Sequence, residues 1–135
     1  MVQTLYYVKG DTVVSVQRRV DTVRSPEHLL RDLLAGPTAS ERASGITSAL
    51  PGTAVIGTVR VASGVALVTI VDGLQGARND EVLAFAQIVC TLDARTDIDG
   101  VVFLRGSNRI DVPAGDGSLT RLPLTAADYR GLRAS

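Results

Sequence analysis

Residues 79–95, with the sequence NDEVLAFAQIVCTLDAR, form the longest apolar segment of the chain that contains neither Gly nor Pro. Asn79 can cap the start of a helix, Asp80 and Glu81 place negative charge in its first turn, and Arg95 places positive charge near its end. Apolar residues recur at helical spacing, at Val82, Phe85, Ala86, Val89 and Leu92. The sequence therefore predicts a central helix that other elements cover on most sides.

One stripe of this helix is small or polar, and it consists of Asp80, Ala84, Gln87 and Thr91. Gln87 stands in the middle of the helix among apolar neighbours, where a buried amide needs hydrogen-bond partners. We expect it to bind the backbone of a loop or strand end, and so to hold the N-terminal hairpin or residues 38–50 in place. Contact with a ligand or partner is the alternative. The flanks at Leu83, Ile88 and Cys90 are expected to touch a second helix or a partner.

Composition limits the classes of protein to consider. The chain has 135 residues, is 45% hydrophobic and carries no net charge, which suits a single domain, residues 1–135, with one core. Lys9 is the only lysine, and no basic cluster interleaves with aromatic residues, so nucleic acid is not an expected partner. Cys90 is the only cysteine, which excludes an intrachain disulfide and favours a buried, reduced and unreactive thiol. The sequence contains neither a membrane-spanning run nor a signal peptide, so we expect any leader or lipid anchor to lie outside it.

The N-terminal part predicts a hairpin followed by a helix. Residues 2–8 and 12–20 are rich in β-branched and aromatic side chains and flank a Gly-Asp turn, which is typical of a β-hairpin. Ser25 is placed as the N-cap of a helix over residues 26–35, because a proline follows it and a glycine ends the apolar pattern. Residues 38–50 are expected to form a loop with one helical turn.

The remaining strands lie on both sides of the central helix. Residues 54–62 and 65–71 are predicted to pair as an antiparallel hairpin, because a short Gly-containing turn separates them. Residues 101–104 form a short apolar strand for the interior of the same sheet, and residues 110–112 begin a Gly-rich and Asp-rich tail. Thr125 is placed to cap a last short helical turn. These elements predict an α+β fold, a two-layer sandwich with an α-β-β-α-β core, with both helices on one face of the sheet.

Five fragments of the chain occur in the order and spacing of the GerMN domain: LLAGP (33–37), SALPGTAV (48–55), VALVTIVDG (65–73), AFAQIVCTL (84–92) and PLTAADY (123–129). The chain therefore resembles this family, which is named for spore germination and sporulation and also occurs in actinobacterial envelope lipoproteins. The resemblance implies an extracytoplasmic, non-enzymatic domain that a lipid or membrane segment tethers. The core is also similar to the ring-building motif of secretion-system components, whereas the single copy here departs from family proteins that carry two.

No motif of catalysis or metal binding stands out. His28 and Asp32 lie four residues apart on the first helix and could relay a proton, but a solvated surface histidine is the better interpretation. Asp93, Asp97 and Asp99 lack the order and the closing glutamate of a calcium loop. We therefore expect no enzymatic activity, no metal and no cofactor.

The leading functional hypothesis is a non-catalytic interaction module of the cell envelope that binds a partner protein or its own copies. The alternative is a module that binds a small molecule or cell-wall glycan, for which aromatic platforms are few. Candidate structural or binding residues are Gln87, Gly36, Pro37, Pro51 and Thr91. A free strand edge or an apolar helix flank is the expected binding surface.

Overall fold

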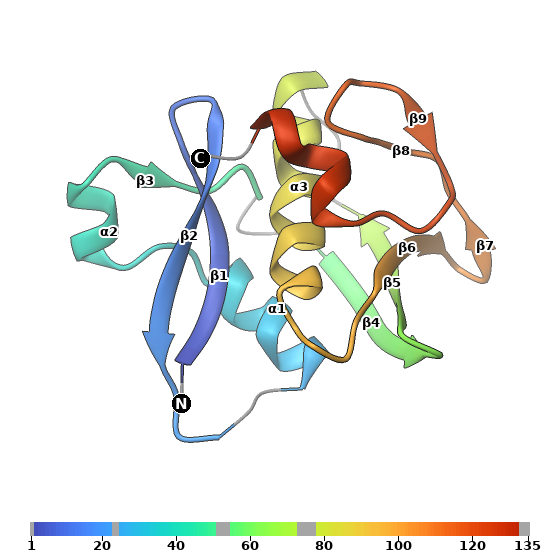
Figure 1. Cartoon of the computed structure of the whole chain (residues 1–135), viewed down its shortest axis with the longest axis horizontal. Coiled ribbons are helices and arrows are strands. Elements are labelled where there is room, and N and C mark those ends of the chain that lie inside the picture. Colours follow the sequence, from blue (N-terminus) through green and yellow to red (C-terminus); the bar gives the residue numbers. More distant parts are fainter. Residues whose placement is uncertain (1, 23–24, 51–54, 73–77, 133–135) are drawn as a thin grey trace.

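The computed structural model describes residues 2–22, 25–50, 55–72 and 78–132. Helix α3 (Arg78–Asp93) lies at the centre, with a three-stranded sheet on one side and a four-stranded sheet on the other (Figure 1). The helix begins one residue before Asn79, so this residue lies in the first turn and is not the N-cap that the sequence suggested. None of the described helices is long and apolar enough to cross a membrane.

The first sheet contains the predicted N-terminal hairpin. Strands β1 (Val2–Lys9) and β2 (Thr12–Arg19) pair antiparallel, and Gly10 makes the turn with a φ of 65° that glycine adopts without strain. Strand β3 (Ile46–Thr47) pairs with the other edge of β1, which gives the order β2-β1-β3. The sequence did not predict β3, because two residues carry no recognisable alternation.

The second sheet has the predicted hairpin at its edge. Strand β4 (Val55–Ala62) pairs antiparallel with β5 (Val65–Asp72) through a two-residue turn in which both residues have positive φ. Strand β6 (Gly100–Arg105) runs parallel to β5, as the α3 crossover between them requires, and β7 (Asn108–Arg109) completes the order β4-β5-β6-β7.

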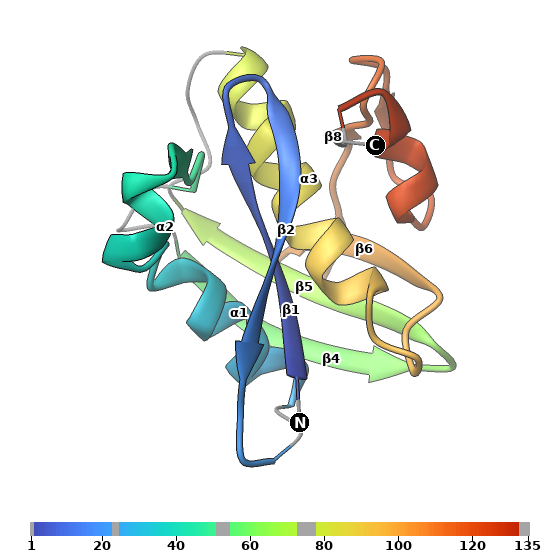
Figure 2. The ribbon, with the colours of Figure 1, turned by 60° about the vertical axis from the view of Figure 1, so that its left-hand side comes forward.

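The helices cover one face of this sheet, as predicted. Helix α1 (Pro26–Leu34) begins after Ser25, whose hydroxyl accepts a hydrogen bond from the backbone N–H of His28. It packs against α3 and β4, while α3 packs against β6, and Figure 1 shows both helices on the side of β4, β5 and β6 that faces the hairpin. Figure 2 shows α1 beside the N-terminal end of β1. The short helix α2 (Ala39–Ala43) is the expected single turn of residues 38–50, and a capping box at Thr38 starts it.

The C-terminal segment closes the molecule around the end of α3. Strands β8 (Val112–Pro113) and β9 (Leu119–Thr120) pair with each other, and the 3-10 helix η1 (Ala126–Leu132) follows Thr125 as expected. Tyr129 on η1 is fully buried, and its hydroxyl donates to the backbone oxygen of Pro113 over 2.8 Å. Burial raises the pKa of this hydroxyl, so Tyr129 stays neutral at physiological pH.

The sequence left a second helix or a partner as alternatives for the flanks of α3, and the structure covers these flanks within the chain. Leu83 and Ile88 are buried within the chain, and so are the α1 leucines Leu29, Leu30 and Leu33. Both sheets, α1 and η1 contact α3, so the helix is enclosed on more sides than a two-layer arrangement provides. Cys90 is a free thiol and is 1% exposed, which confirms its expected burial.

Candidate functional site

Gln87 joins three segments that are distant in sequence. Its Nε2 donates to the backbone oxygen of Tyr6 over 3.2 Å and to the Ser48 hydroxyl over 3.1 Å, and its Oε1 accepts the N–H of Ala49 over 2.7 Å. The side chain is fully buried, and these bonds connect α3 to β1 and to the segment after β3. The sequence predicted that Gln87 binds the backbone of a loop or strand, and these hydrogen bonds agree with that prediction. They hold both the hairpin and residues 48–49 in place.

Thr91 lies one helical turn after Gln87 and binds the same residue of β1. Its Oγ1 accepts the backbone N–H of Tyr6 over 3.0 Å. The two α3 side chains thus take both backbone groups of Tyr6, in the place of a neighbouring strand. Thr91 is fully buried, and a buried hydroxyl requires a hydrogen-bond partner, which the Tyr6 N–H provides.

Gly36 and Pro37 belong to the turn after α1. Gly36 has a φ of 91°, which a side chain would strain, and its carbonyl oxygen accepts from Arg18 Nη2 over 3.3 Å. Both residues line a surface hollow of about 410 Å³ that also includes Ser48. Pro51 lies outside the described residues.

An ion pair ties α2, which follows this turn, to β2. Arg18 Nη2 lies 2.7 Å from Glu41 Oε1, and its guanidinium lies 5.6 Å from the centre of the Tyr7 ring. Burial raises the pKa of the Glu41 carboxyl, but hydrogen bonds from Arg18 and from the Thr38 N–H outweigh burial and hold this pKa below its ordinary value. Burial raises the pKa of Tyr7, and the nearby Arg18 only partly offsets this effect. The cluster therefore fastens the hairpin to α2.

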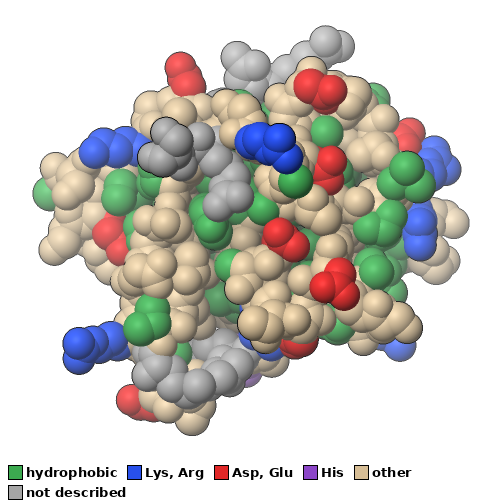
Figure 3. Space-filling view, in the orientation of Figure 1, with side chains coloured by type: hydrophobic (Ala, Val, Ile, Leu, Met, Phe, Trp, Pro, Cys, Tyr) green, Lys and Arg blue, Asp and Glu red, His purple; other side chains and the backbone are tan. Residues whose placement is uncertain are grey.

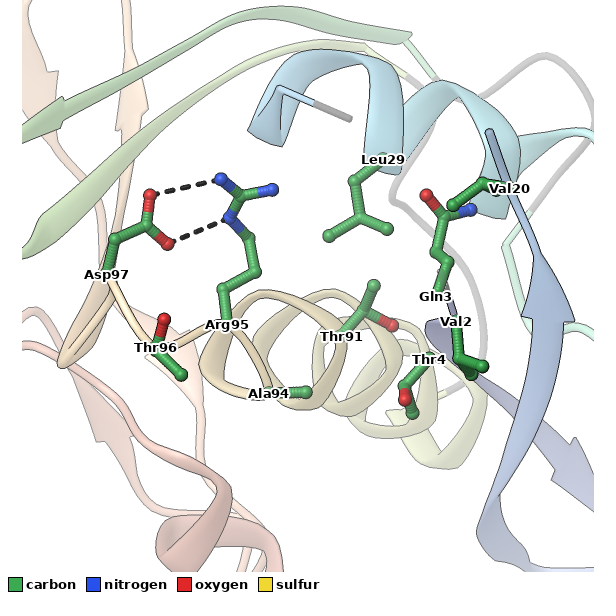
Figure 4. Close-up of a pocket in the computed structure, with 10 residues that line it drawn as sticks. All are labelled: Val2, Gln3, Thr4, Val20, Leu29, Thr91, Ala94, Arg95, Thr96 and Asp97. Atoms are coloured by element: carbon green, nitrogen blue, oxygen red, sulfur yellow. Dashed lines mark hydrogen bonds and ion pairs between the residues drawn. The ribbon is translucent and has the colours of Figure 1, made fainter. Parts of the chain in front are cut away.

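A groove opens where β1 passes the end of α3, and we call it the β1–α3 groove (Figure 4). It has a volume of about 400 Å³ and is lined by residues 2–4 of β1, Val20, Leu29 of α1, Thr91 and residues 94–97. At one end Arg95 and Asp97 form a double hydrogen bond of 2.9 and 3.0 Å, which lowers the pKa of the Asp97 carboxyl. Of the residues that line this groove, sequence reasoning proposed only Thr91 as a candidate structural or binding residue, and it weighed Asp97 only as part of a calcium loop. A glutamine at position 3, on the same strand face as Leu5 and Tyr7, was the available signal.

The residues weighed for chemistry do not form a catalytic group in the described part of the chain. His28 is exposed and its ring contacts Ser25, while Asp32 accepts a hydrogen bond from Gln3 Nε2 over 3.1 Å. Asp97 is paired with Arg95, as described above. No group of three or more His, Cys, Asp or Glu side chains lies together within the described residues.

Comparison with solved structures shows the same fold. The tandem GerMN domains of the sporulation protein GerM from Bacillus subtilis match with a TM-score of 0.71 at 18% identity, over 95% of this chain and 47% of that one, so the chain spans about half of it. The first GerMN domain of the same protein matches with a TM-score of 0.67 at 16% identity, over 94% of this chain and 98% of that one. A candidate lipoprotein from Clostridium perfringens matches with a TM-score of 0.62 at 15% identity, over 99% and 93% of the two chains.

Comparison with sequences identifies the family. No curated protein matches the chain significantly. The model of the Germane family, described as sporulation and spore germination, matches residues 4–111, which include both sheets, all three α-helices and the residues Gln87 and Thr91. The chain therefore belongs to the Germane family of sporulation and spore germination domains.

Proposed function

We propose that this domain is a non-catalytic interaction module of the cell envelope, which binds a partner protein or a second copy of itself through the free edge of β4. The polar side chains of Gln87 and Thr91 form hydrogen bonds with backbone groups inside the domain, so a partner has to bind elsewhere. A surface that offers unpaired backbone groups remains on the outer strand of the larger sheet.

The single observation that carries this proposal is the exposed edge of β4. In the sheet order β4-β5-β6-β7, β5 occupies one edge of β4 and no described strand pairs with the other. Ala62 and Val65 flank the two-residue turn as a hydrogen-bonded pair, so Val59 and Val61 direct their N–H and C=O groups away from β5. Val61 is also 41% exposed. An extended segment of another chain can pair with these groups.

Two competing functions find less support. An enzyme needs acid, base or metal-binding groups that lie together, and the described residues contain no cluster of candidate metal ligands. A glycan module needs aromatic platforms, and the described residues that line the β1–α3 groove include no aromatic side chain. The exposed hydrophobic side chains Leu119 and Leu122 lie near β9, where Figure 3 shows apolar surface on the side of the molecule that carries β7 to β9. They offer a second apolar contact surface, but no unpaired strand edge of the length of β4.

We further propose that the natural protein holds this domain outside the cytoplasm through a lipid anchor. The support is family membership together with the fold shared with a candidate lipoprotein of Clostridium perfringens. Fractionation of the source cells, followed by detection of the protein in the membrane fraction and its release by a protease added outside, tests this placement. Recovery of the protein in the cytoplasm would contradict it.

Site-specific cross-linking tests the β4 edge. A photoreactive amino acid at position 61 of the natural full-length protein is expected to give one discrete cross-linked product in intact envelopes, to a partner or to a second copy. The same amino acid at Ala43, which is exposed on α2, is the matched control and is expected to give none. Equal product patterns from the two positions would contradict binding at this edge.

Two substitutions at Val61 separate pairing from folding. Val61→Pro removes the outward N–H while it leaves the hydrogen bonds to β5 intact, and Val61→Lys places a charge at the edge without removing a donor. Both variants are expected to fold and to lose the cross-linked product formed from a photoreactive group at Val59. Retention of that product by two folded variants would overturn the proposal.

A further inference from the structure

The outer edge of β1 is only partly covered. Val8 and Lys9 pair with β3 at one end, and in the middle Tyr6 gives its N–H to Thr91 and its C=O to Gln87. In an antiparallel strand, alternate residues direct both backbone groups to the same edge. Thr4, two residues before Tyr6, therefore directs its N–H and C=O to this edge as well, where the β1–α3 groove lies.

The backbone groups of Thr4 have no hydrogen-bond partner among the described residues. Its side chain forms one hydrogen bond within the described part of the chain, from Oγ1 to Gln17 Oε1 over 3.2 Å. This bond runs across the hairpin, between residues that lie opposite each other in β1 and β2. Such close side chains fit a non-hydrogen-bonded pair, whose backbone groups point away from the partner strand. The groove thus contains one unpaired donor and one unpaired acceptor from Thr4.

Gln3 adds a second acceptor. The residue is 8% exposed, and its Nε2 is held by Asp32 over 3.1 Å. Its Oε1 accepts no hydrogen bond within the described part of the chain, and Figure 4 shows this atom turned toward the groove, opposite Leu29. An amide oxygen that has no partner among the described residues and that faces the groove is suited to accept a hydrogen bond from a ligand.

The charges of the groove are already balanced. Arg95 and Asp97 bind each other through two hydrogen bonds, so the groove offers no net charge to an anion or a metal ion. Leu29 provides an apolar floor and Ala94 a small side chain at the rim. The available groups therefore match a ligand that is uncharged, that carries alternating donors and acceptors and that has a small apolar side chain.

We propose that the β1–α3 groove binds an extended peptide segment, which adds to the free edge of β1 at Thr4. One residue of such a segment supplies a C=O to the Thr4 N–H and an N–H to the Thr4 C=O, and a further N–H reaches Gln3 Oε1. The volume of about 400 Å³ lies in the range of ligand sites and limits the bound part to a few residues with small side chains. This site is separate from the β4 edge and goes beyond the proposed function, because none of the described residues that line it belongs to β4.

Titration with a defined peptide tests the site. Acetyl-Ala-Val-Ala-amide, added to the isotopically labelled domain, is expected to shift the NMR signals of the Thr4 amide and the Gln3 side-chain amide in a saturable way. The same peptide with an N-methyl group on its valine lacks one donor and is expected to bind about tenfold more weakly. Absence of saturable shifts, or equal affinity for the two peptides, would overturn the inference.

A substitution at the rim provides the matched control in the protein. Ala94→Arg fills the groove from an exposed position and is expected to abolish the shifts, while Ala43→Arg on α2 leaves them unchanged. Circular dichroism checks that both variants remain folded. Undiminished binding by folded Ala94→Arg would also reject the groove. Cross-linking from position 61 is unaffected by Ala94→Arg if the proposed function holds, so failure of the groove and failure of the β4 edge give different results.

Discussion

Gln87 on α3 and Tyr6 on β1 are 81 residues apart in sequence and are joined by a hydrogen bond of 3.2 Å from the Gln87 amide to the Tyr6 carbonyl. The same amide group accepts the N–H of Ala49 over 2.7 Å. One buried side chain therefore satisfies backbone groups of two segments that no regular sheet pairing reaches at these positions. Because unsatisfied buried polar groups are unfavourable, the placement of the hairpin on α3 depends on this amide.

Replacement of Gln87 by Ala is expected to destabilise the domain by about 3 kcal/mol, because it leaves buried polar groups of Tyr6 and Ala49 without partners and opens a cavity. Urea unfolding followed by circular dichroism measures this change. The control is Gln17→Ala on the exposed face of β2, for which a change within about 0.5 kcal/mol is expected. Equal stabilities of the two variants would show that the buried amide has no special structural role.

Thr91→Val keeps the shape of the side chain but removes the oxygen that accepts the Tyr6 N–H. The expected loss is about 1–2 kcal/mol, because the buried N–H is left unpaired. Thr91→Ser keeps the hydroxyl and loses only a methyl group. The amide proton of Tyr6 is therefore expected to exchange with solvent more slowly in the Thr91→Ser variant than in the Thr91→Val variant. Hydrogen exchange measured by NMR compares the two. Identical exchange of the Tyr6 amide in both variants would contradict the assigned role of the hydroxyl.

Much of the fold follows from local sequence. The β-branched runs of β1, β2, β4 and β5, with their Gly-containing turns, predict both hairpins, and the cap at Ser25 predicts α1. Strands β3, β7, β8 and β9 are two residues long, which is too short to show alternation in the sequence. Strand β3 moreover pairs with β1, which is distant in sequence, so only tertiary structure brings the two together. Periodicity showed that α3 is apolar on most sides, but it does not show how many layers cover it, and this is why the sequence left open whether a second helix or a partner covers Leu83 and Ile88.

The candidate sites were predictable to different degrees. A glutamine in the middle of an apolar helix indicates buried hydrogen bonds, and the structure gives Gln87 three of them. The β1–α3 groove required knowledge of how β1 crosses the end of α3, which brings Thr4 close to Ala94 and Arg95. No periodicity or spacing motif in the sequence connects residues so far apart. The binding roles of Gly36 and Pro37 stay predictions.

The ion pair between Arg18 and Glu41 is expected to make stability depend on pH. The pKa of Glu41 is lower in the folded protein than its ordinary value of 4.5, so its contribution is fully present above pH 4.5 and is lost as the pH falls through the lowered folded pKa. When the pH falls from about 5 to about 3, the Glu41→Gln variant is therefore expected to lose less stability than the unsubstituted protein. The melting temperatures of the two proteins, measured at a series of pH values, give this difference. Asp97, whose pKa is also lowered, supplies the comparison through Asp97→Asn, since its ion-pair partner is Arg95 and not Arg18. An unchanged pH profile in Glu41→Gln would contradict the role of this pair.

The last prediction concerns the contact of Gly115 with η1. A Cβ atom at this position would lie 2.7 Å from the backbone oxygen of Asp128 and 2.9 Å from the Cα of Tyr129, and backbone atoms cannot swing aside as a flexible side chain can. The Gly115 N–H also donates to that same Asp128 oxygen over 2.9 Å, so the two segments are held together where the new atom would be placed. Gly115→Ala is therefore expected to destabilise the domain by about 1–3 kcal/mol and to lower its melting temperature by several degrees.

Gly131→Ala is the matched control in the same C-terminal part of the chain, because a Cβ there meets no atom within 4 Å. This variant is expected to leave the melting temperature unchanged or slightly raised. Calorimetry of both variants decides the matter, and equal melting temperatures would mean that η1 does not pack on Gly115 as closely as the structure shows.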